Sequence, residues 1–365
     1  MKIGIITFQR AHNFGAQMQM FALSTFLKSI GHDVSVLDFR NPNIDDIYVR
    51  FFNLRRYRFR NVFKGLKIFW KDFRKFYLPF AHSKIRKFSA FTKENVKLTG
   101  GFCKAEDMPI DFDILIVGSD QVWNYSIIGE KQKNVYFLDD RSDNPSFPKR
   151  ISYAASAEIN DYHYLIDDRE YVQKALNNFS WISTREQALS DLLGNKLQIK
   201  SESILDPTLL LRSEDYIKIA IKPKRDRYLF VYRVNHTSYL SELAKKISQE
   251  CGLEIIEAHA STIPCCCEES YGPREILGFI CYAEVVVTSS FHGTSLSIIN
   301  RKDFYAAYDD HSERVDNLLK SVNLSERSLL SLDDYNGFTP ITFDDKVING
   351  YILHSKQWLL NAINN

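Results

Sequence analysis

The residues best suited to chemistry follow a run of three valines, Val285–Val287. Such a β-branched apolar run is typical of a strand buried on both faces. The next expected strand begins at Asp303. Between them lie residues that can cap a helix or bind an anion: Thr288, Ser289, Ser290, His292, Gly293 and Thr294. They are predicted at a helix N-terminus, where free backbone N–H groups attract anions. The stretch predicts a phosphate or carboxylate site that carries His292, and the alternative is a capped turn with a packed imidazole.

A second candidate is Arg185, which follows the short strand expected at Ser180–Ser183 and precedes a helix. A guanidinium fixed at such a junction can bind a phosphate or carboxylate through two hydrogen bonds. The alternative is an ion pair with Glu186 or with another carboxylate. Asp206, which closes this half of the chain, either holds the junction between domains or binds a substrate hydroxyl.

The first loop of the chain, Gln9–Gly15, leaves the carboxyl end of the strand expected at Lys2–Phe8. Asn13 and Gly15 have the small polar character of a turn that approaches a ligand, and Gln17 stands at the start of the next helix. Asn13 is either a helix cap or a substrate contact. No phosphate-binding glycine fingerprint is present, so a dinucleotide site is not expected.

The buried strand expected at Asp113–Val117 is followed by a third group of polar residues. They are Gly118, Ser119, Asp120, Gln121, Trp123 and Asn124. A glycine lets the backbone approach a ligand, and an acid, amides and an indole are usual in sugar sites. This group predicts acceptor binding, with a structural turn as the alternative.

Strands and helices alternate in two successive runs, which predicts α/β domains with parallel sheets. The expected organisation is an N-terminal α/β domain over residues 1–220, a C-terminal one over 221–340, and a helix over 341–365 that packs back on their junction. With Arg185 in the first domain and His292 in the second, two doubly wound Rossmann-like domains would face a cleft that holds the site.

A basic helical insertion, at about residues 45–100, interrupts the first domain. Between Arg50 and Lys97 the chain carries fifteen Lys or Arg and two acids, a net +13 within a chain of net +2. Apolar residues recur at helical spacing from Val62 to Phe80. The segment either lies on an anionic membrane surface or covers its own domain with a solvated face; no nucleic-acid motif accompanies it, so nucleic acid is not an expected partner.

The remaining composition is that of a globular protein of a reducing compartment. Hydrophobic residues make up 45% and charged residues 25% of the chain, and no apolar run reaches the roughly 18 residues that span a bilayer. Neither a signal sequence nor zinc-type cysteine spacing is seen, since Cys265–Cys267 are three adjacent thiols. We expect a cytoplasmic protein, either free or peripheral at the membrane's inner face, and no metal site.

The stretch TSSFHGTSLSIINRKDFY resembles the C-terminal signature of the polysaccharide pyruvyl transferase family. Four further stretches agree with it in family order over nearly the whole chain: ITFQRAHNFGAQMQMFAL, FDILIVGSDQVWN, ISYAAS followed by ISTREQAL, and ILDPTLLL. The resemblance implies a GT-B-like fold and transfer of a pyruvyl group from phosphoenolpyruvate to a sugar as a ketal, in bacterial surface polysaccharide biosynthesis. The acceptor could be lipid-linked, and no cofactor is implied.

The resemblance also implies roles for two residues. It places the family's essential arginine at Arg185, and His292 is the expected general acid and base, because an imidazole can give and take protons near neutral pH. Many relatives carry an arginine where this chain has Ser290, so the donor's charge must be met elsewhere, by Arg10, Arg233 or Arg314. The alternatives are a GT-B glycosyltransferase that uses a nucleotide sugar and a glycan-binding protein without turnover.

Overall fold

A computed structural model of the chain describes residues 1–48, 79–139, 146–259 and 271–365. Residues 62–78 of the predicted amphipathic run and the three adjacent cysteines, 265–267, lie outside this part. The predicted contact of the basic insertion with membranes therefore stays a prediction. No helix among the described residues combines the length and the apolar character that a membrane crossing requires.

The first half of the chain builds a parallel sheet in the order β2-β1-β3-β4-β5-β6. Its strands are β1 (Lys2–Ile6), β2 (Asp33–Val36), β3 (Ile114–Val117), β4 (Lys149–Ala155), β5 (Trp181–Thr184) and β6 (Glu202–Ser203). Among its described residues, the helices of this half are α1 (Phe14–Ser29), α2 (Pro42–Tyr48), α4 (Pro79–Asn95), α5 (Tyr125–Ile128), α6 (Lys133–Tyr136), α7 (Tyr162–Asp167), α8 (Arg169–Leu176), α9 (Gln187–Leu197) and α10 (Ser213–Ile217).

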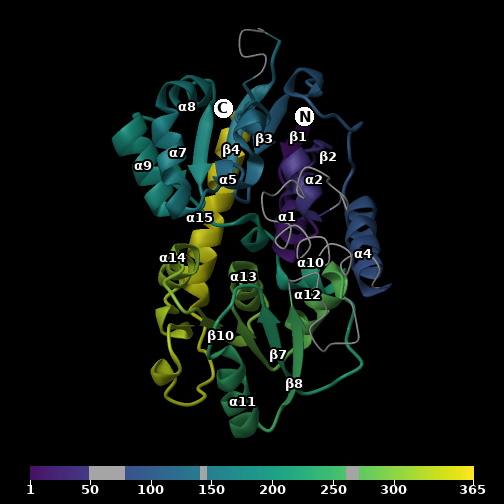
Figure 1. Ribbon diagram of the computed structural model, residues 1–365, viewed down its shortest axis with the longest axis vertical. Helices are drawn as coiled ribbons and strands as arrows, with labels where there is room; N and C mark the ends of the chain where they lie inside the picture. Colours follow the sequence, from purple (N-terminus) through teal and green to yellow (C-terminus); the bar gives the residue numbers. More distant parts are fainter. Residues whose placement is uncertain (49–78, 140–145, 260–270) are drawn as a thin grey trace, which may run out of the picture.

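The second half builds a smaller parallel sheet in the order β11-β10-β9-β7-β8. Its strands are β7 (Tyr228–Arg233), β8 (Glu254–His259), β9 (Val285–Thr288), β10 (Asp303–Ala307) and β11 (Ser328–Leu329). Its helices are α11 (Leu240–Cys251), α12 (Pro273–Tyr282), α13 (Phe291–Ile299), α14 (Glu313–Ser321) and α15 (Asp345–Asn364). Figure 1 shows the two sheets at opposite ends of an elongated molecule.

Both sheets have the same doubly wound topology. In each, the second strand lies at one side of the first and the third strand at the other, so the strand order reverses between β1 and β3 and again between β7 and β9. The predicted fold class, two Rossmann-like domains that face a cleft as in GT-B folds, is thus confirmed. Open sheets of this kind bind ligands at the point of reversal, at the carboxyl ends of the strands.

One helical stretch is interrupted, and one local prediction differs from the structure. Helices α7 and α8 are separate, because Asp168 leaves helical geometry between them and its carboxylate accepts hydrogen bonds from Tyr125 and Lys133. The first loop is shorter than predicted, because Asn13 caps α1 through the N–H of Ala16. Gly15 and Gln17 therefore lie inside the helix.

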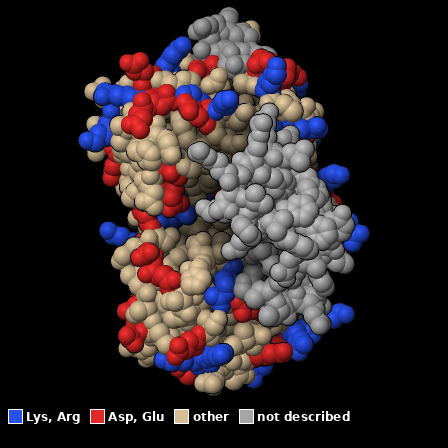
Figure 2. Space-filling model, viewed as in Figure 1, with Lys and Arg blue, Asp and Glu red and all other residues tan. Residues whose placement is uncertain are grey.

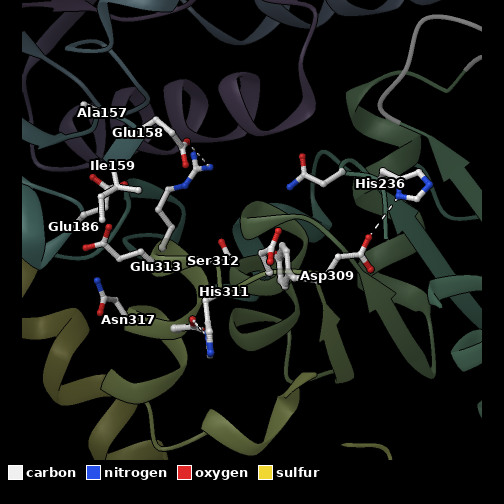
Figure 3. Close-up of a pocket in the computed structure, with 15 residues that line it drawn as sticks. Ala157, Glu158, Ile159, Glu186, His236, Asp309, His311, Ser312, Glu313 and Asn317 are labelled. Carbon is white, nitrogen blue, oxygen red and sulfur yellow. Dashed lines mark hydrogen bonds and ion pairs between the residues drawn. The ribbon is translucent and has the colours of Figure 1, made fainter. Parts of the chain in front are cut away.

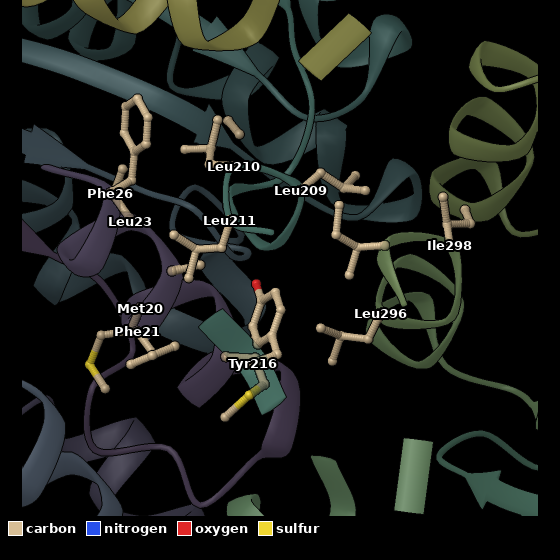
Figure 4. Close-up of a cluster of buried hydrophobic side chains, with 14 of the residues drawn as sticks. Met20, Phe21, Leu23, Phe26, Leu209, Leu210, Leu211, Tyr216, Leu296 and Ile298 are labelled. Atoms are coloured by element: carbon tan, nitrogen blue, oxygen red, sulfur yellow. The ribbon is translucent and has the colours of Figure 1, made fainter. Parts of the chain in front are cut away.

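The two halves share one hydrophobic core. Met20, Phe21 and Leu23 of α1 face the 3₁₀ turn η5 (Pro207–Leu209) and residues of α13, including Leu296 (Figure 4). Helix α15 runs alongside both halves (Figure 1), with Asp345 paired to Arg301 of the second and Trp358 against Tyr153 and Trp181 of the first. Between the lobes the surface is hollowed, and charged side chains gather there (Figure 2).

Candidate functional site

A pocket of about 260 Å³ lies where the two points of strand reversal face each other. Asn13 follows β1 and Asp120 follows β3, so both enter the pocket from the first sheet. Asn235 follows β7 and the turn at 289–292 follows β9, so these enter it from the second. The pocket therefore occupies the position where doubly wound sheets bind ligands, and it does so in both halves at once.

His292 lies in the first turn of α13, as predicted. Ser290 is the N-cap, and its hydroxyl accepts the N–H of Gly293. The imidazole packs against α1 of the other half so closely that a Cβ on Gly15 would overlap its Nδ1 atom. The absence of a side chain at Gly15 thus leaves the space that His292 occupies. Gly293 is required in the turn for a similar reason, because a Cβ there would overlap the Thr288 hydroxyl.

Asp206 holds the imidazole from the other side. Its Oδ2 lies 3.7 Å from His292 Nε2, longer than a direct hydrogen bond but close enough for a charge contact. The same oxygen accepts hydrogen bonds from Ser119 Oγ at 3.0 Å and from Arg185 Nη1 at 3.1 Å. Oδ1 accepts from the Thr208 N–H and hydroxyl, so this fully buried carboxylate has a fixed orientation.

The environment of Asp206 keeps it ionised. Burial by itself raises the pKa of this carboxyl, but the contact with His292, the charge of Arg185 and the Thr208 N–H together lower it well below the usual range. A permanent negative charge therefore faces the imidazole at 3.7 Å.

Arg185 lies beside His292, and its guanidinium donates hydrogen bonds to other side chains of the protein. The side chain is 3% exposed, and besides Asp206 it donates to Glu186 Oε1 at 3.2 Å and to Ser156 Oγ at 2.9 Å. Phe291 covers its face at 4.9 Å. In this arrangement Arg185 positions Asp206 and Glu186, and its direct contact with the donor stays a prediction.

Several predicted substrate contacts are structural instead, which corrects the expectation for them. Trp123 is 1% exposed, stacks on Phe137 and donates to the Tyr136 carbonyl, so it offers no sugar platform. Asn124 is buried, caps α5 and donates to Gln121. Gln17 is buried and donates to two carbonyls of the first loop, those of Gln9 and Ala11. These side chains shape the loops whose neighbours line the pocket.

Of the remaining predicted residues, some line the pocket and others pack behind its lining. Asn13, Asp120, Gln121, Ser289 and Ser290 line the pocket together with His292. Ser289 also holds the loop after β7, because its hydroxyl accepts the N–H groups of Val234 and Asn235.

Three predicted residues support the pocket from behind. Ser119 and Thr294 are fully buried, and Thr294 donates to the carbonyl of Ser290. Gly118 has a φ of +112°, and a Cβ there would overlap the Tyr153 carbonyl, so this position requires glycine.

Of the three arginines considered for the donor's charge, only Arg314 enters the pocket. Arg10 is paired with Asp45 at 2.6 Å, and Arg233 with Glu257 at 2.8 Å. Arg314 is the residue that sequence reasoning could not single out; it stands on the pocket wall, where it pairs with Glu158 of the first half at 3.2 Å. Its only sequence signal is its place at the start of a helix that follows a strand.

Among the described residues, no group of three His, Cys, Asp or Glu side chains has the arrangement of a metal site. The chemistry available in the pocket is that of an imidazole, an arginine, the carboxylate of Asp120, amides, hydroxyls and the N-terminus of α13. This set suits an anionic ligand and a proton transfer.

Comparison with known proteins agrees with this reading of the motifs. A family model described as polysaccharide pyruvyl transferase matches residues 13–311, which include Arg185 and His292. No curated protein matches the chain.

Solved structures of UDP-GlcNAc 2-epimerases are also similar to it. The enzyme from Methanocaldococcus jannaschii is 11% identical, with 99% of this chain and 93% of that one covered at a TM-score of 0.45. The Neisseria meningitidis enzyme, bound to UDP-GlcNAc, is 8% identical, with 99% and 94% covered at a TM-score of 0.48.

Proposed function

Since the chain belongs to the polysaccharide pyruvyl transferase family, an enzyme class, we propose that it transfers a pyruvyl group from phosphoenolpyruvate to a sugar hydroxyl pair. The product is a pyruvate ketal on a bacterial surface polysaccharide or on its precursor. The observation that carries this proposal is the placement of His292: it stands at a helix N-terminus, in a pocket at two facing points of strand reversal, beside a buried carboxylate.

The donor requires a site for two anionic groups, a phosphate and a carboxylate. The first turn of α13 leaves backbone N–H groups without acceptors inside the helix, and its dipole favours an anion there. Arg314, on the same wall, is 25% exposed at its side chain and can turn from Glu158 toward a ligand. Together they replace the arginine that is expected at Ser290.

The reaction needs a group that both gives and takes a proton. An acceptor hydroxyl adds to C2 of phosphoenolpyruvate while C3 takes up a proton and becomes a methyl group. The phosphate leaves with the electrons of the C2–O bond, and a second hydroxyl adds to C2. Of the two hydroxyl protons, one ends on the methyl group and the other on the phosphate, so no oxidant or reductant is required.

His292 is the side chain in the pocket suited to both proton transfers. As imidazolium it protonates C3, and as imidazole it accepts a proton from a hydroxyl. Asp206, at 3.7 Å, faces the ring, and Arg185 holds Asp206. The buried network behind the imidazole is therefore a positioning device, as a carboxylate behind a histidine is in other enzymes.

The experiment that tests the donor combines binding and turnover. Phosphoenolpyruvate should raise the melting temperature, and incubation with sugar acceptors should release one phosphate for each acceptor molecule that gains the mass of a pyruvyl ketal. Stabilisation by a nucleotide diphosphate without any effect of phosphoenolpyruvate would contradict the proposal and favour a glycosyltransferase.

The role of Arg314 is tested with a matched arginine. Arg314→Ala should abolish the thermal shift caused by phosphoenolpyruvate, because it removes the cation from the pocket wall. Arg225→Ala, which removes an exposed arginine paired with Glu254 at the surface, should leave that shift unchanged. A normal shift in Arg314→Ala would exclude this residue from the donor site.

A further inference from the structure

A second cavity of about 700 Å³ lies between the two halves, next to the pocket that holds His292. Its wall is formed by residues of both halves, among them Glu158 and Glu186 of the first and Glu313 of the second (Figure 3). The two cavities share Asn235, Tyr308, Ser312 and Arg314 as lining residues, so they adjoin along one wall.

Carboxylates dominate this second cavity. Those on its lining are Glu158, Glu186, Asp309, Asp310, Glu313 and Asp316. The one arginine among its lining residues is Arg314, and it is already paired with Glu158. The two histidines, His236 and His311, lie against Asp309 and Asp316 at 3.5 and 3.0 Å. An anionic ligand would thus meet a surplus of negative charge.

The side chain of Glu186 offers the cavity a hydrogen-bond acceptor that no described residue donates to. The residue is 1% exposed, and its Oε1 is held by Ser156 Oγ at 2.7 Å and by Arg185 Nε at 3.2 Å. Its Oε2 has no hydrogen-bond partner among the described residues, although the side chain lines the cavity. A buried carboxylate oxygen in this state is unfavourable, and a donor from a bound molecule would satisfy it.

Burial also raises the pKa of Glu186, in spite of the neighbouring Arg185. Burial and then the charge of Glu186 raise the pKa of Glu313. Both directions mean that further negative charge is unfavourable here, whereas a hydroxyl or ammonium donor is favourable.

We propose that this second cavity is the acceptor subsite, and that Glu186 Oε2 accepts a hydrogen bond from the acceptor sugar. The charge of the cavity assigns the acceptor to the neutral or amine-bearing sugars and excludes uronic acids. The inference rests on the proposed function, because an acceptor is required only if the chain is a transferase.

The geometry agrees with this assignment in two respects. The volume lies within the range of small-molecule sites and is large enough for one or two sugar rings. A sugar in the second cavity that reaches the shared wall at Arg314 would present its hydroxyls to a donor held beside His292. The guanidinium of Arg185 further joins the two sites, since it bonds both Glu186 and Asp206.

The first test uses the unmodified protein without phosphoenolpyruvate. Binding of a methyl hexoside, a methyl 2-amino-2-deoxyhexoside and a methyl hexuronide is measured by saturation-transfer NMR. We expect the first two to bind and the hexuronide to bind at least about tenfold more weakly, because like charges repel in a partly buried site. A hexuronide that binds as well as the neutral sugar, or no binding of neutral sugar, would overturn the inference.

The second test compares two carboxylates of the same cavity. Glu186→Gln should weaken binding of the preferred glycoside at least about tenfold, whereas Asp310→Asn, at the exposed rim, should change it less than about twofold. The far-ultraviolet circular dichroism and the melting temperature of each variant without ligand serve as the control for folding. Equal effects of the two substitutions would refute the role of Glu186.

The two proposals can fail separately. If phosphoenolpyruvate does not bind the unmodified protein but neutral glycosides do so through Glu186, the donor is wrong and the subsite stands. If phosphoenolpyruvate binds and the protein pyruvylates uronic acids as readily as neutral sugars, the proposed donor is supported and the proposed acceptor subsite is refuted. Should Glu186→Gln fail to fold, the comparison of sugar classes on the unmodified protein still decides.

Discussion

At the scale of single residues, the site is a chain of contacts that ends at His292. The imidazole faces Asp206, Asp206 is held by Arg185, and Arg185 also bonds Glu186. Asp206, Arg185 and Glu186 are buried, so the effects of substituting them on activity cannot be separated from effects on folding. Arg185→Ala, for example, would leave two buried carboxylates unpaired and should destabilise the protein as well as reduce its activity.

His292→Ala is expected to lower turnover at least about a hundredfold, because it removes the group that gives and takes the proton. The fold should persist, since the side chain is partly exposed at 13%. Initial rates of phosphate release with phosphoenolpyruvate and a sugar acceptor measure the effect. His354→Ala, an exposed histidine of α15, is the control. A nearly normal rate in a folded His292→Ala variant would remove this residue from the mechanism.

Asp206→Asn is expected to lower the free energy of unfolding by about 3 kcal/mol at neutral pH, because it removes one partner of a buried ion pair. The pKa of Asp206 is depressed in the folded state, so its stabilising effect is present above the unfolded pKa of about 3.9 and is lost as the pH falls below it.

Denaturant unfolding at several pH values measures the difference in the free energy of unfolding between the unmodified protein and Asp206→Asn. It should stay constant from about pH 5 to pH 8 and narrow below about pH 4. Asp111→Asn, which changes a surface carboxylate that is 93% exposed, should alter stability by less than about 0.5 kcal/mol. A difference that does not change with acid would mean that Asp206 is not ionised in the folded protein.

At the scale of secondary structure, the site depends on how α1 and α13 meet. Helix α1 begins at the carboxyl end of β1, helix α13 begins at that of β9, and the two helices pack on each other across the junction. His292 lies against α1 where Gly15 has no side chain. The position of the imidazole is therefore set by a helix from the other half of the chain.

Gly15→Ala is expected to lower turnover more than about tenfold, because the added Cβ would displace the imidazole from its place beside Asp206. Steady-state rates and the melting temperature should be measured together. Gly194→Ala is the matched control: it also lies in a helix, α9, but its added Cβ meets nothing within 4 Å. That variant should keep full activity and gain up to about 1 kcal/mol of stability. Full activity in Gly15→Ala would show that the contact does not position His292.

At the scale of the whole molecule, the two halves behave as one packed body. Their shared core contains residues of both sheets, and α15 contacts both halves. Arg185 and His292 lie 3.1 and 3.7 Å from the same oxygen of Asp206, so they are already together without a closing motion. A continuous core predicts cooperative unfolding of both halves.

Leu243→Ala tests this cooperativity, because Leu243 is fully buried in the second half while the described tryptophans, 123, 181 and 358, contact the first. The cavity should cost about 2–5 kcal/mol and lower the midpoint of tryptophan fluorescence and of far-ultraviolet circular dichroism equally. Leu353→Ala, at a leucine that is 66% exposed, should leave both midpoints in place. A shift in circular dichroism alone would show that the halves unfold independently.

Features that depend on neighbouring residues could be predicted from the amino-acid sequence alone. The valine run before Thr288 and the serine cap at Ser290 predicted a buried strand followed by a helix with His292 in its first turn, and the structure has both. Alternation of strands and helices likewise predicted two doubly wound sheets, because hydrophobic periodicity and capping act within a few residues of the chain.

Which polar residues reach the pocket depends on how distant parts of the chain pack together. Trp123 and Asp120 belong to one motif, yet the indole packs into the core and the carboxylate lines the cleft. Neither the pairing of Arg185 with Asp206 nor the fit of His292 against Gly15 has a local signal. Each joins residues far apart in the chain, and such contacts depend on how the two sheets pack rather than on the residues beside them.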